Sequence, residues 1–145
     1  FPEALELIGE SLSEQGKPEE AIAIYNDLLT RKISDPSHIH YKMGLIREDQ
    51  GKQEEATSAY RKVLETYDRS LQLTPKHGSD SHYRFGGALY KAKQYPKAIN
   101  ALKTARELFP DHPSRAWADY LIAQAYSETK TRNKKNKKRK KKNNT

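Results

Sequence analysis

Two segments of the chain are near-copies of each other. EQGKPEEA contains Gly16, and DQGKQEEA contains Gly51, 35 residues later. A third related segment, AKQYPKAI, places Ala98 where the first two have Ala21 and Ala56, and it follows the second after 42 residues. A chain that repeats itself at this interval is expected to stack similar small units rather than to fold around one central core.

Apolar residues flank each copy at helical spacing. Around the first copy they are Leu5, Ile8 and Leu12 on one side and Ala21, Ile22, Tyr25, Leu28 and Leu29 on the other. The other two copies have the same arrangement, which follows the i, i+3, i+4, i+7 spacing of an amphipathic helix. Each copy therefore predicts a helix, a short turn and a helix. No strand is expected, so the predicted fold class is all-α.

The repeated residues resemble the tetratricopeptide repeat, whose pattern is W-x2-L-G-x2-Y, then A-x3-F, then P over 34 residues. The matching residues are Ile8, Gly9, Ala21 and Tyr25; Met43, Gly44, Ala56 and Tyr60; Phe85, Gly86, Ala98, Leu102 and Pro110; and, in a partial fourth copy, Ile122, Ala123 and Tyr126. One departure is Arg47, which stands where an aromatic residue or leucine is usual. The resemblance implies a helix-turn-helix solenoid over residues 1–129. It would have about three repeats, at about 2–36, 37–78 and 79–112, and a final helix at 113–129.

The repeats make two further predictions about packing. Gly9, Gly44 and Gly86 are expected to let the first helix of each pair approach the second closely, where a larger side chain would cost roughly 1–3 kcal/mol. The second interval is seven residues longer than the first, which predicts a second helix lengthened to run from about 53 to 73 and to end before Pro75. The alternative is a break near Asp68 with a looped insertion. The run SDS at 79–81 is interpreted as the N-cap of the next helix.

Charge is divided unevenly along the chain. The whole sequence has 27 Lys and Arg against 19 Asp and Glu, a net charge of +8, but residues 130–145 hold ten of the cations and no acid. The remaining 129 residues are therefore slightly acidic. Residues 130–145 contain no apolar side chain, so we expect a disordered basic tail. Its principal cations are Lys134, Lys135, Lys137, Lys138, Arg139, Lys140, Lys141 and Lys142.

Composition and motifs argue against several classes of protein. There is no cysteine for a disulfide, a zinc site or a thiol nucleophile, and the apolar runs are too short to span a bilayer. His38 and His40 are two residues apart and would point to different faces of a helix, while His77 and His82 are expected to flank a loop. No phosphate-binding loop or catalytic constellation is found. We therefore expect no enzyme activity, no metal site and no cofactor.

The family resemblance places function on the first helices of the repeats, which line the concave groove and bind a peptide or protein. The residues expected there are Glu6, Glu10, Tyr41, Leu45, Glu48, Tyr83, Tyr90, Trp117, Tyr120 and Gln124. The groove should thus be acidic at one end and aromatic at the other, which favours a partner with basic and apolar residues over the acidic C-terminus of a chaperone. The alternative for Tyr83 and Trp117 is that they only pack between adjacent repeats.

Other interactions stay open at this point. The tail could be a solubilising terminus, contact nucleic acid or another polyanion nonspecifically, hold an anionic membrane, or fold over the acidic groove. The last helix, with Tyr126, is a candidate for self-association or for docking another helix. The segment 109–126 is similar to bacterial envelope proteins of the family. The chain begins at Phe1 rather than Met, so we expect upstream sequence. A cytoplasmic location is expected, with the bacterial cell envelope as the alternative.

Overall fold

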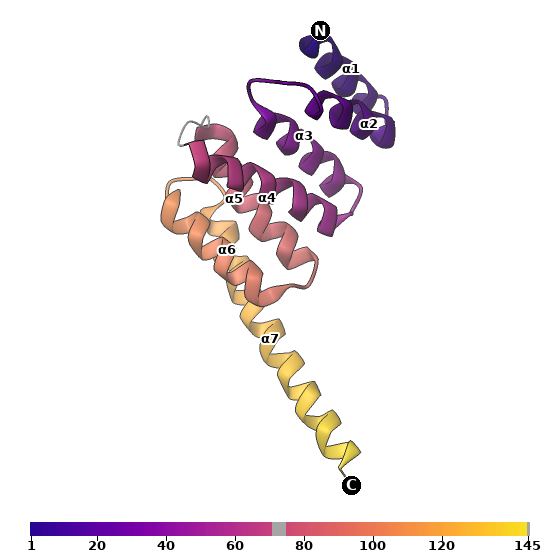
Figure 1. Ribbon diagram of the computed structural model, residues 1–145. Helices are drawn as coiled ribbons and strands as arrows, with labels where there is room; N and C mark the ends of the chain where they lie inside the picture. Colours follow the sequence, from indigo (N-terminus) through magenta and orange to yellow (C-terminus); the bar gives the residue numbers. More distant parts are fainter. Residues whose placement is uncertain (71–74, 145) are drawn as a thin grey trace. The chain divides into compact units, whose positions relative to one another are not determined.

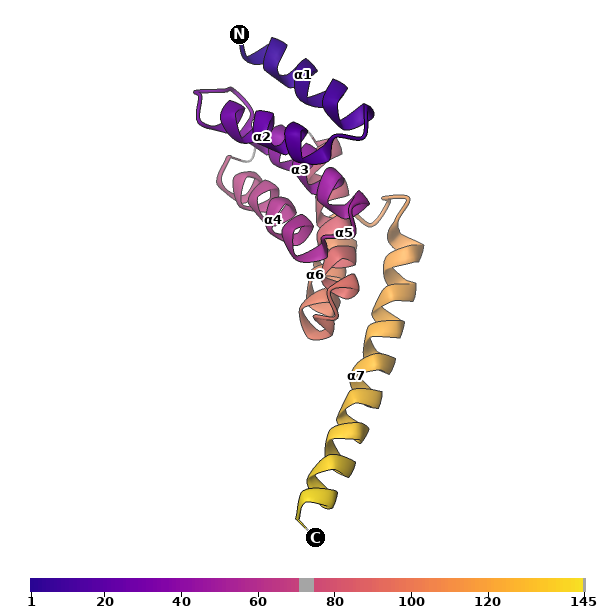
Figure 2. The same cartoon turned by 90° about the vertical axis from the view of Figure 1, so that its right-hand side faces the viewer.

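A computed structural model describes residues 1–70 and 75–144, and within this range the side chains of all residues except 66–70, 75 and 76. The described residues form seven α-helices and no strand (Figure 1). They are α1 (Pro2–Glu14), α2 (Pro18–Leu29), α3 (Pro36–Asp49), α4 (Gln53–Ser70), α5 (Pro75–Lys91), α6 (Tyr95–Leu108) and α7 (Arg115–Asn143). The longest is α7, which Figure 2 shows as one uninterrupted helix. No described helix is both long enough and apolar enough to cross a membrane.

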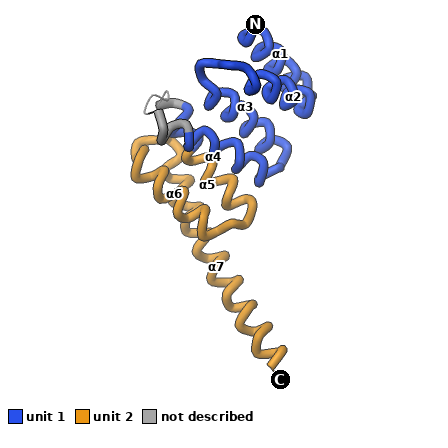
Figure 3. Tube along the Cα trace, in the orientation of Figure 1, with its two compact units in different colours: residues 1–81 blue, residues 82–145 orange. Residues whose placement is uncertain are grey.

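The chain divides into two compact units, residues 1–81 and residues 82–145, coloured separately in Figure 3. The first unit contains α1 to α4 and the beginning of α5. Here α1 packs against α2, α3 packs against α4, and α2 packs against α3. The second unit contains the rest of α5, α6 and α7, and in it α6 packs against α7. The predicted all-α fold of paired helices is confirmed.

The turns inside the three pairs have the same backbone geometry. After α1, the Gly16 amide donates to Ser13 O (3.1 Å) and the Lys17 amide donates to Leu12 O (2.9 Å), which is the double bond of a Schellman cap. The turn after α3 is built in the same way around Gly51. Both glycines have a positive φ, 74° and 75°. The third turn places Lys93 at the equivalent position with a φ of 62°, a conformation that costs a side-chain-bearing residue about 1–2 kcal/mol.

Close approach of paired helices depends on a glycine in each first helix. A Cβ at Gly9 would lie 2.6 Å from the Tyr25 ring, and one at Gly44 would lie 2.5 Å from the Tyr60 ring. In the third pair the corresponding distance from Gly86 is 2.5 Å, to the side chain of Leu102. The three contacts confirm the role predicted for these glycines.

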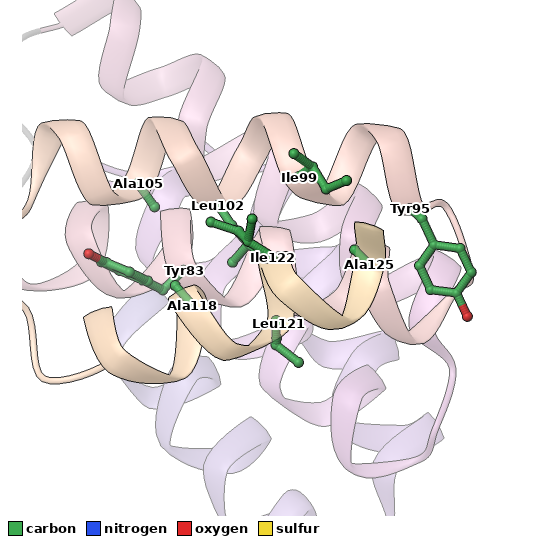
Figure 4. Packing of buried hydrophobic residues seen from close by; sticks show 9 residues of the cluster. All are labelled: Tyr83, Tyr95, Ile99, Leu102, Ala105, Ala118, Leu121, Ile122 and Ala125. Carbon is green, nitrogen blue, oxygen red and sulfur yellow. The ribbon is translucent and has the colours of Figure 1, made fainter. Parts of the chain in front are cut away.

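Each unit has its own apolar cluster. In the first unit the buried members are Ala21, Ile22, Tyr25, Leu28, Ile39 and Ile46. In the second they are Tyr83, Tyr95, Ile99, Leu102, Ala105, Ala118, Leu121, Ile122 and Ala125. Figure 4 shows Leu102 of α6 and Ile122 of α7 near the centre of the second cluster. Tyr25, Leu102 and Ile122 fall on the helical faces that the apolar spacing indicated, whereas Tyr83 was expected on the groove side, and Ile8 of the apolar pattern is 47% exposed.

Arg47, the departure from the family pattern, lies at a junction of helices. Its guanidinium donates from Nη1 to Glu19 Oε1 of α2 (2.7 Å) and from Nε to Glu55 Oε2 of α4 (2.8 Å). The hydrogen bond from Arg47, supported by Lys52 and Gln50, lowers the pKa of Glu19 to about 2. An ion-pair junction thus stands where the family usually has an apolar contact.

The helices on both sides of the insertion are longer than their counterparts, since α5 has 17 residues against 14 in α3. The predicted long helix is present as α4, which is described as far as Ser70 and has 18 residues against 12 in α2. The prediction that it continues to 73 falls on residues outside the described range. The next helix, α5, begins at Pro75, so residues 79–81 lie inside it and the interpretation of SDS as an N-cap is wrong. His77 and His82 likewise lie on α5 rather than beside a loop.

The basic tail differs from its prediction. Instead of disordered chain after 129, α7 continues to Asn143. The segment has no glycine or proline, and lysine and arginine are good helix formers. The packed half of α7 supplies the nucleus that an isolated helix of this length would lack, and cations near a helix C-terminus interact favourably with its dipole. Composition alone predicted disorder because it ignores a helix that is already started.

Candidate interaction surfaces

A polar network joins α1 to α3 on the face expected to line the groove. Lys42 Nζ donates to Glu6 Oε1 (2.8 Å) and also to Glu10 Oε1. The Lys42 side chain is only 17% exposed, so it sits largely out of water between the two carboxylates. Lys42 could not be selected from the sequence, because the two carboxylates that surround it lie on a different helix, more than 30 residues earlier in the chain.

The pKa values of this network follow from its contacts. Burial by itself would raise the pKa of Glu6, but the hydrogen bond and charge of Lys42, with help from His38, outweigh burial and lower it. Burial would lower the pKa of Lys42, and its hydrogen bonds to Glu10 and Glu6 raise it instead. Both groups are therefore held in their charged forms at neutral pH.

The network continues from α3 to the beginning of α5. His38 Nε2 lies 2.8 Å from Glu6 Oε1, and His38 Nδ1 lies 3.1 Å from His77 Nε2. The Tyr41 hydroxyl donates to Asp80, and the Tyr41 ring lies 4.7 Å from the ring of His77. Tyr41, a predicted groove residue, thus contacts α5, which is the first helix of the third pair. The contacts of His77 and Asp80 could not be read from the sequence, since the long insertion hid where α5 begins.

Between α1 and α3 lies a pocket of about 280 Å³. It is lined by Glu10, Ser13, Glu14, Tyr25, Lys42, Leu45, Ile46 and Asp49. The predicted groove residues Glu10 and Leu45 are among them, and Glu14 and Asp49 follow these two by one helical turn. Glu14 and Asp49 are exposed and have no side-chain hydrogen bond or ion pair within the described part of the chain. With only Lys42 to oppose Glu10, Glu14 and Asp49, this pocket, which we call the acidic pocket, carries a net negative charge over an apolar floor.

Glu48, the fifth groove residue predicted in the first unit, makes an intramolecular contact. It accepts a hydrogen bond of 2.8 Å from the Tyr60 hydroxyl of α4. Of the five groove residues predicted in the first unit, Glu10 and Leu45 therefore line its acidic pocket. The other three, Glu6, Tyr41 and Glu48, make contacts between helices.

In the second unit, Tyr83 is not a surface residue. It is 1% exposed, its hydroxyl donates to Phe109 O (2.7 Å), and its ring stacks on His112 with centroids 4.6 Å apart. The expectation that it contacts a partner is wrong in this structure, and the packing alternative describes it. Tyr90 is half-buried against Tyr95, with ring centroids 5.5 Å apart.

The remaining predicted residues lie on one side of α7. Trp117 is 40% exposed and covers Gly87, where a Cβ would lie 2.3 Å from the indole. Tyr120 is 60% exposed, and Gln124 is partly exposed one turn later. This side adjoins the buried residues Ala118, Leu121, Ile122 and Ala125, and Leu121 is the buried residue nearest to Trp117 around the helix axis. We call Trp117, Tyr120 and Gln124 the aromatic face of α7.

Tyr126 lies apart from the aromatic face. Its hydroxyl accepts a hydrogen bond of 2.8 Å from Lys103 Nζ of α6, and the same ammonium lies 5.4 Å from the ring centroid. Tyr126 thus helps to hold α7 against α6, although half of it is exposed. Self-association through the last helix stays a prediction.

The basic part of α7 is exposed throughout, from Lys130 to Asn143. At its base, the Arg132 guanidinium lies 5.5 Å from the Tyr95 ring centroid, a cation–π contact that ties the start of this segment to α6. Beyond that contact the helix carries lysine and arginine on every side.

Comparisons with known proteins agree with this architecture. Two family models described as tetratricopeptide repeat match residues 6–70 and 80–112. The chain is similar to solved structures of MamA from Desulfovibrio magneticus RS-1. One, residues 41 to the end, is 25% identical with a TM-score of 0.69, covering 87% of this chain and 64% of that one. A MamA RS-1 double mutant gives 25% identity and a TM-score of 0.71, covering 90% and 66%.

A third solved structure is PcrH from Pseudomonas aeruginosa. It is 18% identical with a TM-score of 0.62, covers 86% of this chain and 91% of that one, and supports the fold alone. The chain spans about two thirds of the length of the MamA structures. No curated protein sequence matches it significantly. Each helix pair has the same kind of close contact at a glycine of its first helix. Together with this contact, the family matches over 6–70 and 80–112 show that the chain belongs to the tetratricopeptide repeat family.

Proposed function

We propose that this chain is a protein-interaction scaffold whose acidic pocket binds a peptide or protein segment carrying basic and apolar residues. Tetratricopeptide repeats generally serve as non-enzymatic interaction scaffolds, and the fold supports that role. The observation that carries the finer proposal is the acidic pocket between α1 and α3, where Glu14 and Asp49 stand exposed and unpaired beside Leu45. A lysine or arginine would reach the carboxylates while a neighbouring apolar side chain covers Leu45.

The same geometry disfavours an acidic ligand. The cation of the pocket, Lys42, already bonds Glu6 and Glu10, so its charge is compensated. An acidic chaperone C-terminus would meet Glu14 and Asp49 without a free cation in the pocket, and like charges placed together at an interface cost several kcal/mol.

The aromatic face of α7 supports the scaffold role in the second unit. Exposed tryptophan and tyrosine side chains are frequent anchors of protein interfaces. Tyr120 projects from α7 without an intramolecular hydrogen bond within the described residues, and Trp117 is held in place over Gly87. We propose that this face gives a second contact to the same class of partner.

Titration of the full chain with labelled peptides of equal length tests the proposal. The set comprises a lysine–leucine peptide, a lysine–serine peptide and a glutamate–leucine peptide, measured by fluorescence anisotropy. The lysine–leucine peptide should bind best. Glu14→Gln with Asp49→Asn should weaken it about tenfold, since two charge contacts are lost.

The matched control is Glu54→Gln with Glu107→Gln, which removes the same charge from exposed positions outside the pocket. It should leave the affinity within about twofold. Equal weakening by both pairs of substitutions would show that only net charge matters and would reject the pocket. On the second unit, Tyr120→Ala should weaken binding of the lysine–leucine peptide, whereas Tyr126→Phe should not.

A further inference from the structure

The basic end of α7 has a geometry that selects among polyanions. From Lys130 to Asn143 it carries ten lysine and arginine residues, no acid and no apolar side chain, and every residue of it is exposed. At 1.5 Å per residue it extends for about 21 Å, which is about six base pairs of duplex at 3.4 Å each.

The cations surround the helix instead of forming a stripe. At 3.6 residues per turn, their projections around the axis leave no gap wider than about 80°. A flat anionic surface, such as a membrane, would contact only the half of them that faces it. The absence of apolar and aromatic side chains also leaves nothing to insert into a bilayer or to stack on unpaired bases.

A ligand that encloses the helix uses these charges better. The major groove of B-form DNA is about 12 Å wide, an α-helix with its side chains is about 10–12 Å across, and the groove has phosphates along both rims. The major groove of A-form RNA is too narrow for side chains to enter. Phosphates on both sides would also relieve the repulsion among ten like charges on one helix.

From this geometry we propose that residues 130–143 of α7 bind duplex DNA without sequence preference, lying as a helix in the major groove. Binding is carried by phosphate contacts, so it weakens steeply with salt. This site uses none of the residues of the acidic pocket or of the aromatic face. The peptide-binding proposal and the DNA-binding proposal can therefore be refuted independently.

Fluorescence anisotropy of the full chain with a labelled duplex of about 20 base pairs tests the proposal. We expect a Kd of about 10⁻⁶–10⁻⁴ M near physiological salt, and a slope of log K against log salt of about −4.5 or steeper if five or more phosphates are neutralised. Replacing Lys137, Lys138, Lys140 and Lys141 by glutamine should make the slope shallower and weaken binding more than tenfold. Glutamine at Lys17, Arg31, Lys32 and Lys52, which are exposed in the first unit, changes the net charge equally and should leave the slope unchanged.

A second variant separates helix from charge. Asn133→Pro with Asn136→Pro keeps all ten cations and interrupts the helix. It should weaken duplex binding about tenfold or more. Unchanged affinity would overturn the groove geometry, because charge alone would then suffice. The substituted positions lie outside the packed core. Circular dichroism of each full-length variant verifies that its repeats still fold.

Competing ligands complete the test. Double-stranded RNA, single-stranded DNA and vesicles containing an anionic phospholipid should each bind more weakly than the DNA duplex at equal salt. Equal or tighter binding of any one of them would overturn the choice of ligand. Absence of duplex binding at about 50 mM salt would overturn the whole proposal, while peptide binding at the acidic pocket would be unaffected.

Discussion

Three glycines and one lysine show how single residues set the spacing of this fold. Gly9, Gly44 and Gly86 each face a side chain of the partner helix, at a distance that leaves no room for a methyl group. Lys93 occupies a left-handed turn position that glycine occupies in the other two pairs. These positions lie outside the acidic pocket and the aromatic face of α7.

Gly44→Ala is expected to lower the free energy of unfolding by about 1–3 kcal/mol. The new methyl group would lie 2.5 Å from the Tyr60 ring, which is buried and held by its hydrogen bond to Glu48 and so has little freedom to move. Urea unfolding followed by circular dichroism measures the change. Ser58→Ala, at an exposed position of α4, should change stability by less than about 0.5 kcal/mol, and an equal loss in both variants would contradict the steric explanation.

Lys93→Gly is expected to do the opposite and raise stability by about 1 kcal/mol. The reason is that φ is 62° at this position, where a side chain is strained and glycine is not. The reverse exchange, Gly51→Lys, should lower stability by a similar amount, because Gly51 has a φ of 75°. Thermal unfolding of both variants, compared with the parent chain, measures the pair, and shifts of the same sign would contradict the prediction.

At the scale of elements, the helices are joined by charge as well as by apolar packing. Arg47 links α3 to α2 and α4 through Glu19 and Glu55, and Lys42 links α3 to α1. Such links depend on pH because the carboxylates must stay ionised. The contribution of the ion pairs to helix packing can therefore be measured separately from that of the apolar contacts.

Arg47→Leu should flatten the acid side of the stability profile. The pKa of Glu19 is lowered to about 2 from 4.5, so its contribution is present above pH 4.5 and is lost as pH falls toward 2. Without the guanidinium, which makes the largest contribution, this loss should become smaller, although the hydrogen bonds of Lys52 and Gln50 to Glu19 remain. At neutral pH leucine restores the apolar contact usual in the family. Urea unfolding at a series of pH values between these limits measures the difference. Arg31→Leu, which removes an exposed pair with Asp27, is the control and should keep the parent's profile.

At the scale of the whole molecule, the net positive charge lies outside the packed helices. The packed helices carry little net charge, whereas the last part of α7 concentrates the cations on an exposed helix. Repulsion among these cations opposes the helix and is screened by salt.

The helical content of the full chain should therefore rise with ionic strength. Between about 10 mM and 1 M salt the Debye length falls from about 30 Å to about 3 Å, so the repulsion along residues 130–143 is largely removed. Far-ultraviolet circular dichroism of the parent chain should show the increase, and the chain with Asn133→Pro and Asn136→Pro should show much less. A decrease with salt in the parent chain would contradict the prediction.

The helix pairs, their turns and most of the core positions could be predicted from the sequence, because these depend on residues close together in the chain. Apolar spacing identified Tyr25, Tyr60 and Leu102, and the small residues opposite them. Two of the predicted groove residues, Glu10 and Leu45, line the acidic pocket. The tertiary structure alone decided what depends on distant partners, such as the bonds of Lys42 to α1, the contact of His38 with His77 and the burial of Tyr83. It also decided that the tail is helical, because composition describes each segment in isolation whereas a helix is extended from one already packed.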